Sequence, residues 1–225
     1  LRLSPDNNER FTQAHSYEAV YGGGEGSGVT GNTTMSLSDS YPFAADAADK
    51  SIYGGGKGGV VGGKSNITIT INNTAAEADF IGKVLSGSGT DADGNLADNV
   101  QGEKTITVLT TNRDNRATLV GEKLTGFDVL NVGNADAVNC DNLILKATKR
   151  FDSRPVDMAP EDNGRSDRVN LNASSLVMEG EWNGHIGSLN MNGICSIQIT
   201  KKAPGQTYPL LMDGKPSHTG GRRTL

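Results

Sequence analysis

A short segment of this chain occurs twice, and the second copy follows the first closely in the sequence. The first copy, EAVYGGGEG, begins at Glu18, and the second, KSIYGGGKG, begins at Lys50. After each copy comes a run in which apolar residues alternate with Ser, Thr or Asn. Such alternation is typical of a half-buried strand. Each copy thus reads as a strand, a glycine-rich turn and a second strand. The distance between the copies lies within the period of about 20–50 residues seen in solenoids, which predicts stacked repeats.

Shorter apolar runs continue through the rest of the chain, and Asn, Gly or Asp separates most of them. Ala78–Gly82 is a candidate for a degenerate third copy of the apolar-apolar-glycine step. One short strand cannot bury its apolar face alone, whereas strands stacked about 4.8 Å apart pair their backbones and align their inward side chains. We therefore predict an all-β solenoid of short parallel strands. The alternative is a β-sandwich, which also has turn signals about every 8–12 residues.

The composition excludes several classes of protein. Glycine accounts for 30 of the 225 residues and aromatics for 5%. Because Gly, Asn, Ser and Thr are poor helix formers, a helical bundle is disfavoured. No apolar run reaches the roughly 18 residues of a membrane-spanning helix, so we expect no direct membrane insertion. The net charge of −5 does not favour nucleic acid as a partner.

We predict one β-solenoid domain over residues 1–202 and a C-terminal tail or linker over residues 203–225. Polar segments interrupt the strand pattern at about 86–101 and 150–168. Loops of such length are usually functional or flexible. Insertions in a solenoid project from one side, which is often the binding side. Contacts with a ligand are therefore expected in these two segments.

The two repeat copies, AVYGGGEGSGVTGNTTMSLS and SIYGGGKGGVVGGKSNITITI, resemble the glycine-rich repeats of large bacterial surface proteins. They are similar to adhesin- or autotransporter-like proteins that carry a pectate-lyase-type right-handed parallel β-helix. The resemblance covers about residues 17–75 well and the rest only in style. It implies an extracellular or cell-surface bacterial protein with a role in adhesion or carbohydrate contact. It supplies no catalytic residue.

An acidic stretch in the first polar segment has the composition of a calcium loop. Asp91, Asp93, Asn95 and Asp98 place three carboxylates and an amide around Gly94. Calcium takes about six to eight oxygen ligands, and short acidic loops with a glycine bend supply them. The residue order of an EF-hand is absent. These four residues are candidate calcium ligands, and a solvated acidic loop is the alternative.

A second candidate contact site contains the single tryptophan, Trp182, and a nearby histidine, His185. An exposed tryptophan beside Asn and His can stack on a sugar ring, because its apolar face suits CH surfaces. The alternative is a tryptophan in the core or at an end of the stack. The two cysteines, Cys140 and Cys195, either form a disulfide or are small buried hydrophobic residues.

The leading hypothesis from the sequence is a non-enzymatic bacterial cell-surface module, part of a larger secreted protein. Its partner would be a glycan or a host surface protein. The alternative is a polysaccharide-active β-helix enzyme, a lyase or a glycoside hydrolase. Such an enzyme requires clustered carboxylates and a basic residue. In the second polar segment, Asp152, Asp167 and Arg168 are of the right types, but their spacing does not single them out.

Overall fold

The structure, a computed structural model, is all-β in the residues that it describes. The described residues are 19–38, 51–71, 83–111, 117–134, 143–153, 168–182, 184–202, 207, 210–213, 215–220 and 223–224. Every regular element within them is a β-strand, from β1 to β19. The prediction of an all-β chain of short strands is confirmed.

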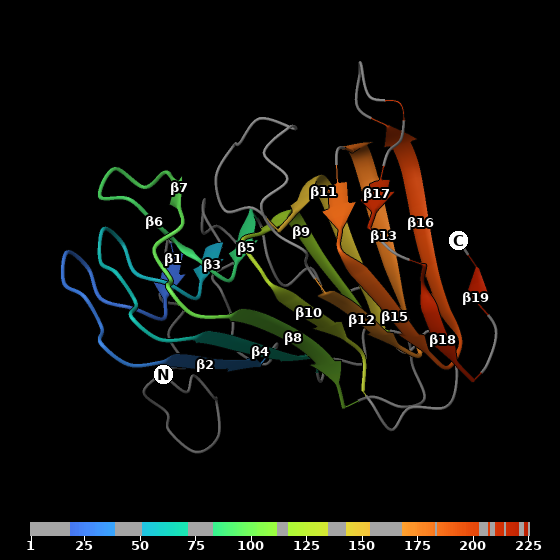
Figure 1. Cartoon of the computed structure of the whole chain (residues 1–225), viewed down its shortest axis with the longest axis horizontal. Coiled ribbons are helices and arrows are strands. Elements are labelled where there is room, and N and C mark those ends of the chain that lie inside the picture. The colour runs from blue at the N-terminus through green and yellow to red at the C-terminus, as the bar shows by residue number, and fades with distance from the viewer. Residues whose placement is uncertain are drawn as a thin grey trace.

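Most strands belong to two parallel sheets that face each other across a shared core (Figure 1). The eight-stranded sheet contains, in spatial order, β1 (Ala19–Tyr21), β3 (Ser51–Tyr53), β5 (Val84–Ser86), β9 (Ala117–Thr125), β11 (Leu143–Asp152), β13 (Ser174–Trp182), β16 (Cys195–Lys202) and β19 (Arg223–Thr224). The seven-stranded sheet contains β2 (Thr33–Ser38), β4 (Ser65–Ile71), β8 (Lys104–Thr110), β10 (Val129–Val132), β12 (Arg168–Asn172), β15 (Ser188–Asn192) and β18 (Ser217–Thr219). The smaller sheets pair β6 (Gly89–Thr90) with β7 (Leu96–Ala97) and β14 (Gly184–Ile186) with β17 (Leu210–Met212).

The chain alternates between the two large sheets, and we call one strand of each sheet, with the segment that joins them, a rung. All strand pairs within the two large sheets are parallel. The sandwich alternative implies antiparallel sheets. Pairing also continues beyond residue 202, because β17, β18 and β19 pair with β14, β15 and β16.

The segments in which apolar and polar residues alternate form strands, as the sequence predicts. In β4 and β8, every second residue is buried and the residues between are half-buried. Register aligns the inward side chains of successive strands, so that Ile69, Val108 and Val132 follow one another in a single column. Their side chains are fully buried. Each such side chain contributes about 1.5–3 kcal/mol by leaving water.

The first three rungs carry an extra side, which we call the glycine arm. Arm 1 is residues 22–32, arm 2 is residues 54–64 and arm 3 is residues 87–103. Arms 1 and 2 stack at the spacing of the sequence repeat, as the bridges Glu25–Lys57 and Val29–Val61 show. The arms therefore contact one another as the strands do.

The third rung begins with β5 and Gly87, whereas Ala78–Gly82, the third copy suggested by the sequence, lies outside the described residues. Tyr21 pairs with Tyr53, and Tyr53 pairs with Ser86. The sequence distance from the start of arm 2 to the start of arm 3 is therefore nearly the same as that from arm 1 to arm 2. Val61 pairs with Val100, which lies later in the chain than that spacing would place it. Arm 3 therefore contains an insertion, which forms the hairpin of β6 and β7.

Glycine is required where one arm lies directly on the next. A Cβ atom added at Gly63 of arm 2 would lie 2.7 Å from the backbone carbon of Gly31 in arm 1. A Cβ atom at Gly59 would overlap the carbonyl oxygen of Ser27, and at Gly62 it would lie 3.0 Å from that of Thr30. Real Cβ atoms rarely approach backbone atoms so closely. The glycines of arm 2 thus permit backbone-on-backbone stacking.

Candidate functional site

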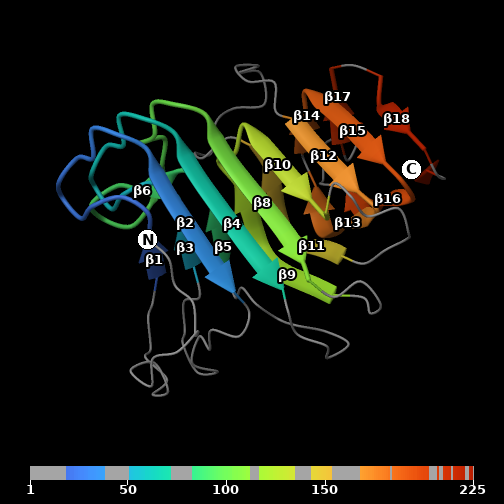
Figure 2. The same ribbon diagram turned by 90° about the horizontal axis from the view of Figure 1, so that it is seen from below.

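Figure 2 shows the seven-stranded sheet from its outward side. The side chains on this side are mostly polar, and we call the surface the polar face. Side chains alternate across a strand, so each strand contributes every second residue. One in-register column runs through all seven strands: Ser36, Thr68, Thr107, Asn131, Asn170, Asn190 and Ser217. At about 4.8 Å per step the column is about 29 Å long. Among the described outward side chains of these strands, only Arg168 is charged.

Hydrogen bonds link the amides of this column from strand to strand. The Nδ2 of Asn131 donates to Thr107 Oγ1 at 3.1 Å, and that of Asn170 donates to Asn131 Oδ1 at 2.7 Å. The Nδ2 of Asn190 donates to Asn170 Oδ1 at 2.8 Å, and Ser217 Oγ donates to Asn190 Oδ1. An amide has two N–H donors and two acceptor lone pairs. Each asparagine of the ladder donates one of these hydrogen bonds and accepts another. One N–H donor and one acceptor lone pair of each amide are therefore not used within the ladder.

The outward side of the eight-stranded sheet differs in chemistry. In one of its columns Val120, Lys146, Val177 and Gln198 follow in register. Lys146 Nζ lies 3.1 Å from Glu179 Oε1 in an ion pair. This surface therefore mixes valine with paired charges, whereas the corresponding column of the polar face contains only neutral hydrogen-bonding groups.

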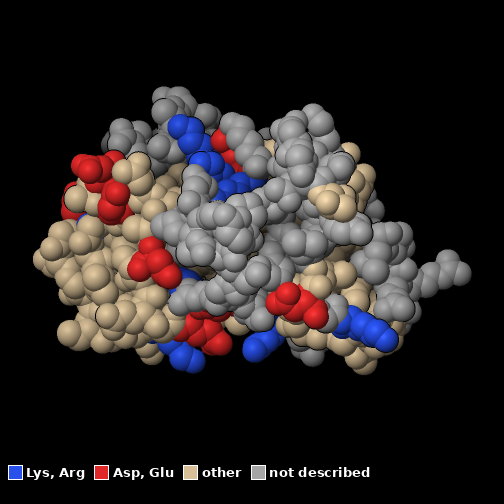
Figure 3. All heavy atoms as spheres, turned by 45° about the horizontal axis from the view of Figure 1, so that its top comes forward, with Lys and Arg blue, Asp and Glu red and all other residues tan. Residues whose placement is uncertain are grey.

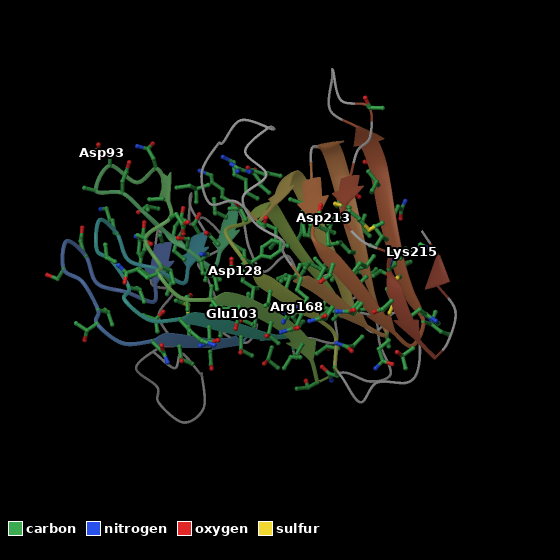
Figure 4. The ribbon with its side chains drawn as sticks, viewed as in Figure 1. Asp93, Glu103, Asp128, Arg168, Asp213 and Lys215 are labelled. Carbon is green, nitrogen blue, oxygen red and sulfur yellow. The ribbon has the colours of Figure 1, made fainter. Side chains whose placement is uncertain are left out.

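The hairpin of arm 3 contains three of the four candidate calcium ligands, Asp91, Asp93 and Asn95. Asp91 Oδ1 accepts from the backbone N–H of Asn95 at 2.8 Å, and Asp91 Oδ2 accepts from Asn95 Nδ2 at 3.0 Å. These bonds, the side-chain bond first, lower the pKa of Asp91 below its usual value. Asp93 lies at the outer end of the hairpin (Figure 4), and Figure 3 shows acidic side chains gathered at this end of the molecule.

Asp98, the fourth candidate, directly follows β7 of the hairpin, and its Oδ1 lies 3.3 Å from Lys104 Nζ. The structure thus joins Asp91 to Asn95 and Asp98 to Lys104. Within the described part of the chain, no group of three or more His, Cys, Asp or Glu side chains is arranged to hold a metal ion. Calcium binding by the hairpin remains a prediction.

Lys104 is a functional candidate that the sequence reasoning missed. Its side chain is fully buried, at 0% exposure, and its Nζ also lies 3.5 Å from Asp128 Oδ2. Asp128 Oδ2 accepts the backbone N–H of Lys104 as well, at 2.8 Å. Buried lysines are rare unless paired. The signal in the sequence is the position of the lysine in KTITVLT, where alternation points it inward.

The same corner of the rungs contains a buried hydroxyl. Ser65 pairs with Lys104 in register, and its Oγ is buried with no hydrogen-bond partner in the described structure. Thr33 of the preceding rung pairs with Ser65, and the Oγ1 of Thr33 donates to the carbonyl of Gly54 at 2.8 Å.

Figure 4 shows Glu103, Asp128 and Arg168 in the middle of the molecule, near the starts of β8, β10 and β12.

The other residues singled out from the sequence are placed less completely. Trp182 ends β13 in the eight-stranded sheet, and His185 lies in β14 of a separate small sheet. Their side chains lie outside what the structure describes, so sugar stacking stays a prediction. Cys195 is a free, buried thiol, whereas Cys140 lies outside the described residues. So do residues 154–167 of the second polar segment.

Comparison with known proteins gives no relative. No protein-family model, no curated protein and no solved structure matches the chain. In the residues that the structure describes, there is no helix of the length and apolarity needed to cross a bilayer.

Proposed function

We propose that this chain is a non-enzymatic module of a bacterial secreted or cell-surface protein, and that its polar face binds a glycan. The observation that carries the proposal is the in-register column of Thr and Asn side chains with its amide ladder. Sugar hydroxyls both donate and accept hydrogen bonds. A row of amides that each keep one free donor and one free acceptor complements a chain of such hydroxyls.

The fold of the module, in this proposal, is a right-handed parallel β-helix. The alternation of the chain between two parallel sheets, with each rung in register with the next, supports this architecture. Crossover connections between parallel strands of one sheet are right-handed in about 98% of cases. The resemblance of the glycine repeat to adhesin-like surface proteins supports the extracellular location.

A binding experiment tests the glycan contact directly. The full chain is titrated by calorimetry with a panel of neutral and acidic polysaccharides, with Asn170→Ala as the face variant. Gln198→Ala is the matched control, because Gln198 is an exposed amide on the outward side of the other sheet. We expect at least about a tenfold loss of affinity, or about 1.4 kcal/mol, for the face variant only. Equal affinity in both variants would place the contact elsewhere.

The same samples separate binding from catalysis. After incubation, the polysaccharides are assayed for new reducing ends and for unsaturated products. A non-enzymatic module leaves the polysaccharides unchanged. Turnover that disappears when one acidic cluster is changed would overturn the proposal in favour of a lyase or a glycoside hydrolase. Binding to a host protein without glycans would redirect it to a protein partner.

A further inference from the structure

The buried side chain of Lys104 places an amine beside two partly exposed carboxylates. Its side chain is fully buried, and Nζ lies 3.3 Å from Asp98 Oδ1 and 3.5 Å from Asp128 Oδ2. Asp98 and Asp128 keep side-chain exposures of 40% and 21%. Lysine therefore reaches the carboxylates from the inside of the rung.

From this geometry we propose that Lys104 and Asp98 form an intramolecular amide bond, a covalent modification that is independent of glycan binding. Amide formation requires the neutral forms of both groups. Proton transfer within the pair gives a neutral amine, which is a nucleophile, and a neutral carboxylic acid, which is an electrophile. The site thus places the amine within 3.5 Å of both a reaction partner and a proton acceptor.

The two carboxylates have different roles in this proposal. Asp128 is held in place, because its Oδ2 accepts the backbone N–H of Lys104 at 2.8 Å. It is the proton carrier. Asp98 comes from the segment after the hairpin and has the shorter contact with Nζ. It is the acceptor of the new bond.

The reaction balances without any co-reactant. The Nζ of Lys104 bonds to Cγ of Asp98, and one Cγ–O bond of Asp98 breaks. The departing oxygen leaves as water with two protons that come from the ammonium, the first of them carried by Asp128. Asp128 ends as a carboxylate, so it is regenerated. No oxidant, reductant or metal is required.

Proximity lowers the barrier that makes such a condensation slow in free solution. Groups held in contact in a well-oriented intramolecular reaction have effective concentrations of about 10⁵–10⁸ M. Lys104 is held in this way, because strand β8 fixes its backbone and the neighbouring arm packs against its Cβ. A Cβ atom added at Gly87 would lie 3.0 Å from that of Lys104.

The test is the intact mass of the purified full chain, followed by tandem mass spectrometry of its peptides. We expect the parent protein to be lighter than its sequence mass by one water molecule, with Lys104 and Asp98 in one branched peptide. Asp98→Ala and Lys104→Arg should show their full sequence masses, and Asp128→Asn should show slow or absent loss. Circular dichroism confirms that each variant is folded.

Two results would overturn the proposal. One is a folded parent protein with its full sequence mass after prolonged incubation, which leaves Lys104 as an ion-paired amine. The other is loss of water at a different place. Asp93–Gly94 is an Asp–Gly sequence, and such sequences lose water by forming a succinimide. Mild alkali reverses a succinimide but leaves an amide bond intact, so this treatment distinguishes the two.

Discussion

Paired strands hold all rungs in register, but the first three rungs and the rungs that follow them add different contacts to this pairing. In the first region, glycine arms lie directly on one another, and their backbones exchange hydrogen bonds such as Gly23 N–H to Gly55 O at 3.0 Å. In the second region, side-chain hydrogen bonds add to the strand pairing, as in the amide ladder from Asn131 to Asn190. The comparison teaches that rungs at the same spacing can be stabilised either by backbone contacts between arms or by side-chain hydrogen bonds between strands. Backbone stacking requires the absence of side chains, and ladder stacking requires one particular side chain.

The contact at which the two regions meet should be the most sensitive. Lys104 of the third rung is paired with Asp128, which precedes β10 of the fourth. The double variant Asp98→Ala, Asp128→Ala leaves a buried amine without these carboxylates and unable to form the proposed amide bond, which costs at least about 3–5 kcal/mol. Urea denaturation measures the loss. Adding Lys104→Met should restore most of the lost stability, and a double variant as stable as the parent would contradict the contact of Lys104 with these carboxylates.

Arm stacking is tested by two glycines at equivalent positions of arms 1 and 2. Gly63→Ala should destabilise the protein by about 1–3 kcal/mol, because its methyl group would overlap backbone atoms of arm 1. Gly31→Ala is the matched control, since a Cβ atom there meets nothing within 4 Å. Thermal melting followed by circular dichroism compares the two. Equal melting temperatures would show that the arms do not stack tightly.

The ladder of the second region should give a smaller effect. Asn170→Ala removes one hydrogen bond to Asn131 and one from Asn190, each worth about 0.5–1.5 kcal/mol. We expect a loss of about 1–2 kcal/mol in free energy of unfolding. Gln198→Ala should change it by less than about 0.5 kcal/mol, as surface substitutions usually do. If the ladder does not stabilise the protein, Asn170→Ala and Gln198→Ala should change the free energy of unfolding by the same small amount.

The smallest effect is expected at the hairpin inserted in arm 3. Because hydrogen bonds from Asn95 lower the pKa of Asp91 in the folded state, the carboxylate stabilises the turn above the ordinary pKa of aspartate. That contribution disappears as the pH falls through the lowered value. A carboxyl-carbon NMR titration should place the midpoint of Asp91 below the usual aspartate value. Asn95→Ala should move the midpoint upward, whereas the distant Asn66→Ala should leave it in place.

Much of the fold follows from the sequence, because alternation survives in several of the strands, such as β4, β8, β12 and β15. The runs around Ile67, Ile106 and Ile197 all lie in strands. The third rung is harder to find, since Tyr-Gly-Gly-Gly is replaced by Ser-Gly-Ser-Gly at Ser86 and the spacing between paired residues grows along arm 3. Pairing across such insertions depends on contacts between rungs, which a linear pattern does not contain.

The candidate sites are less accessible to sequence reasoning. Acidic composition draws attention to Asp91 and Asp98 together, but the structure gives them different partners, Asn95 and Lys104. The amide ladder combines Asn131 and Asn170, which are far apart in the chain and become neighbours only through strand register. Its trace in the sequence is an asparagine between two apolar residues, in LNV, VNL and LNM. Nothing in that trace indicates that the three lie on one surface.

Duplication of the repeat would have different outcomes for the two copies. At the positions where arm 2 has Gly59 and Gly62, arm 1 has Ser27 and Thr30, whose side chains are exposed. An extra copy of the second unit, inserted in tandem, would therefore lengthen the stack with glycine at each contact. An extra copy of the first unit would place serine and threonine side chains between two arms. Two residues thus determine which unit of the molecule can be multiplied.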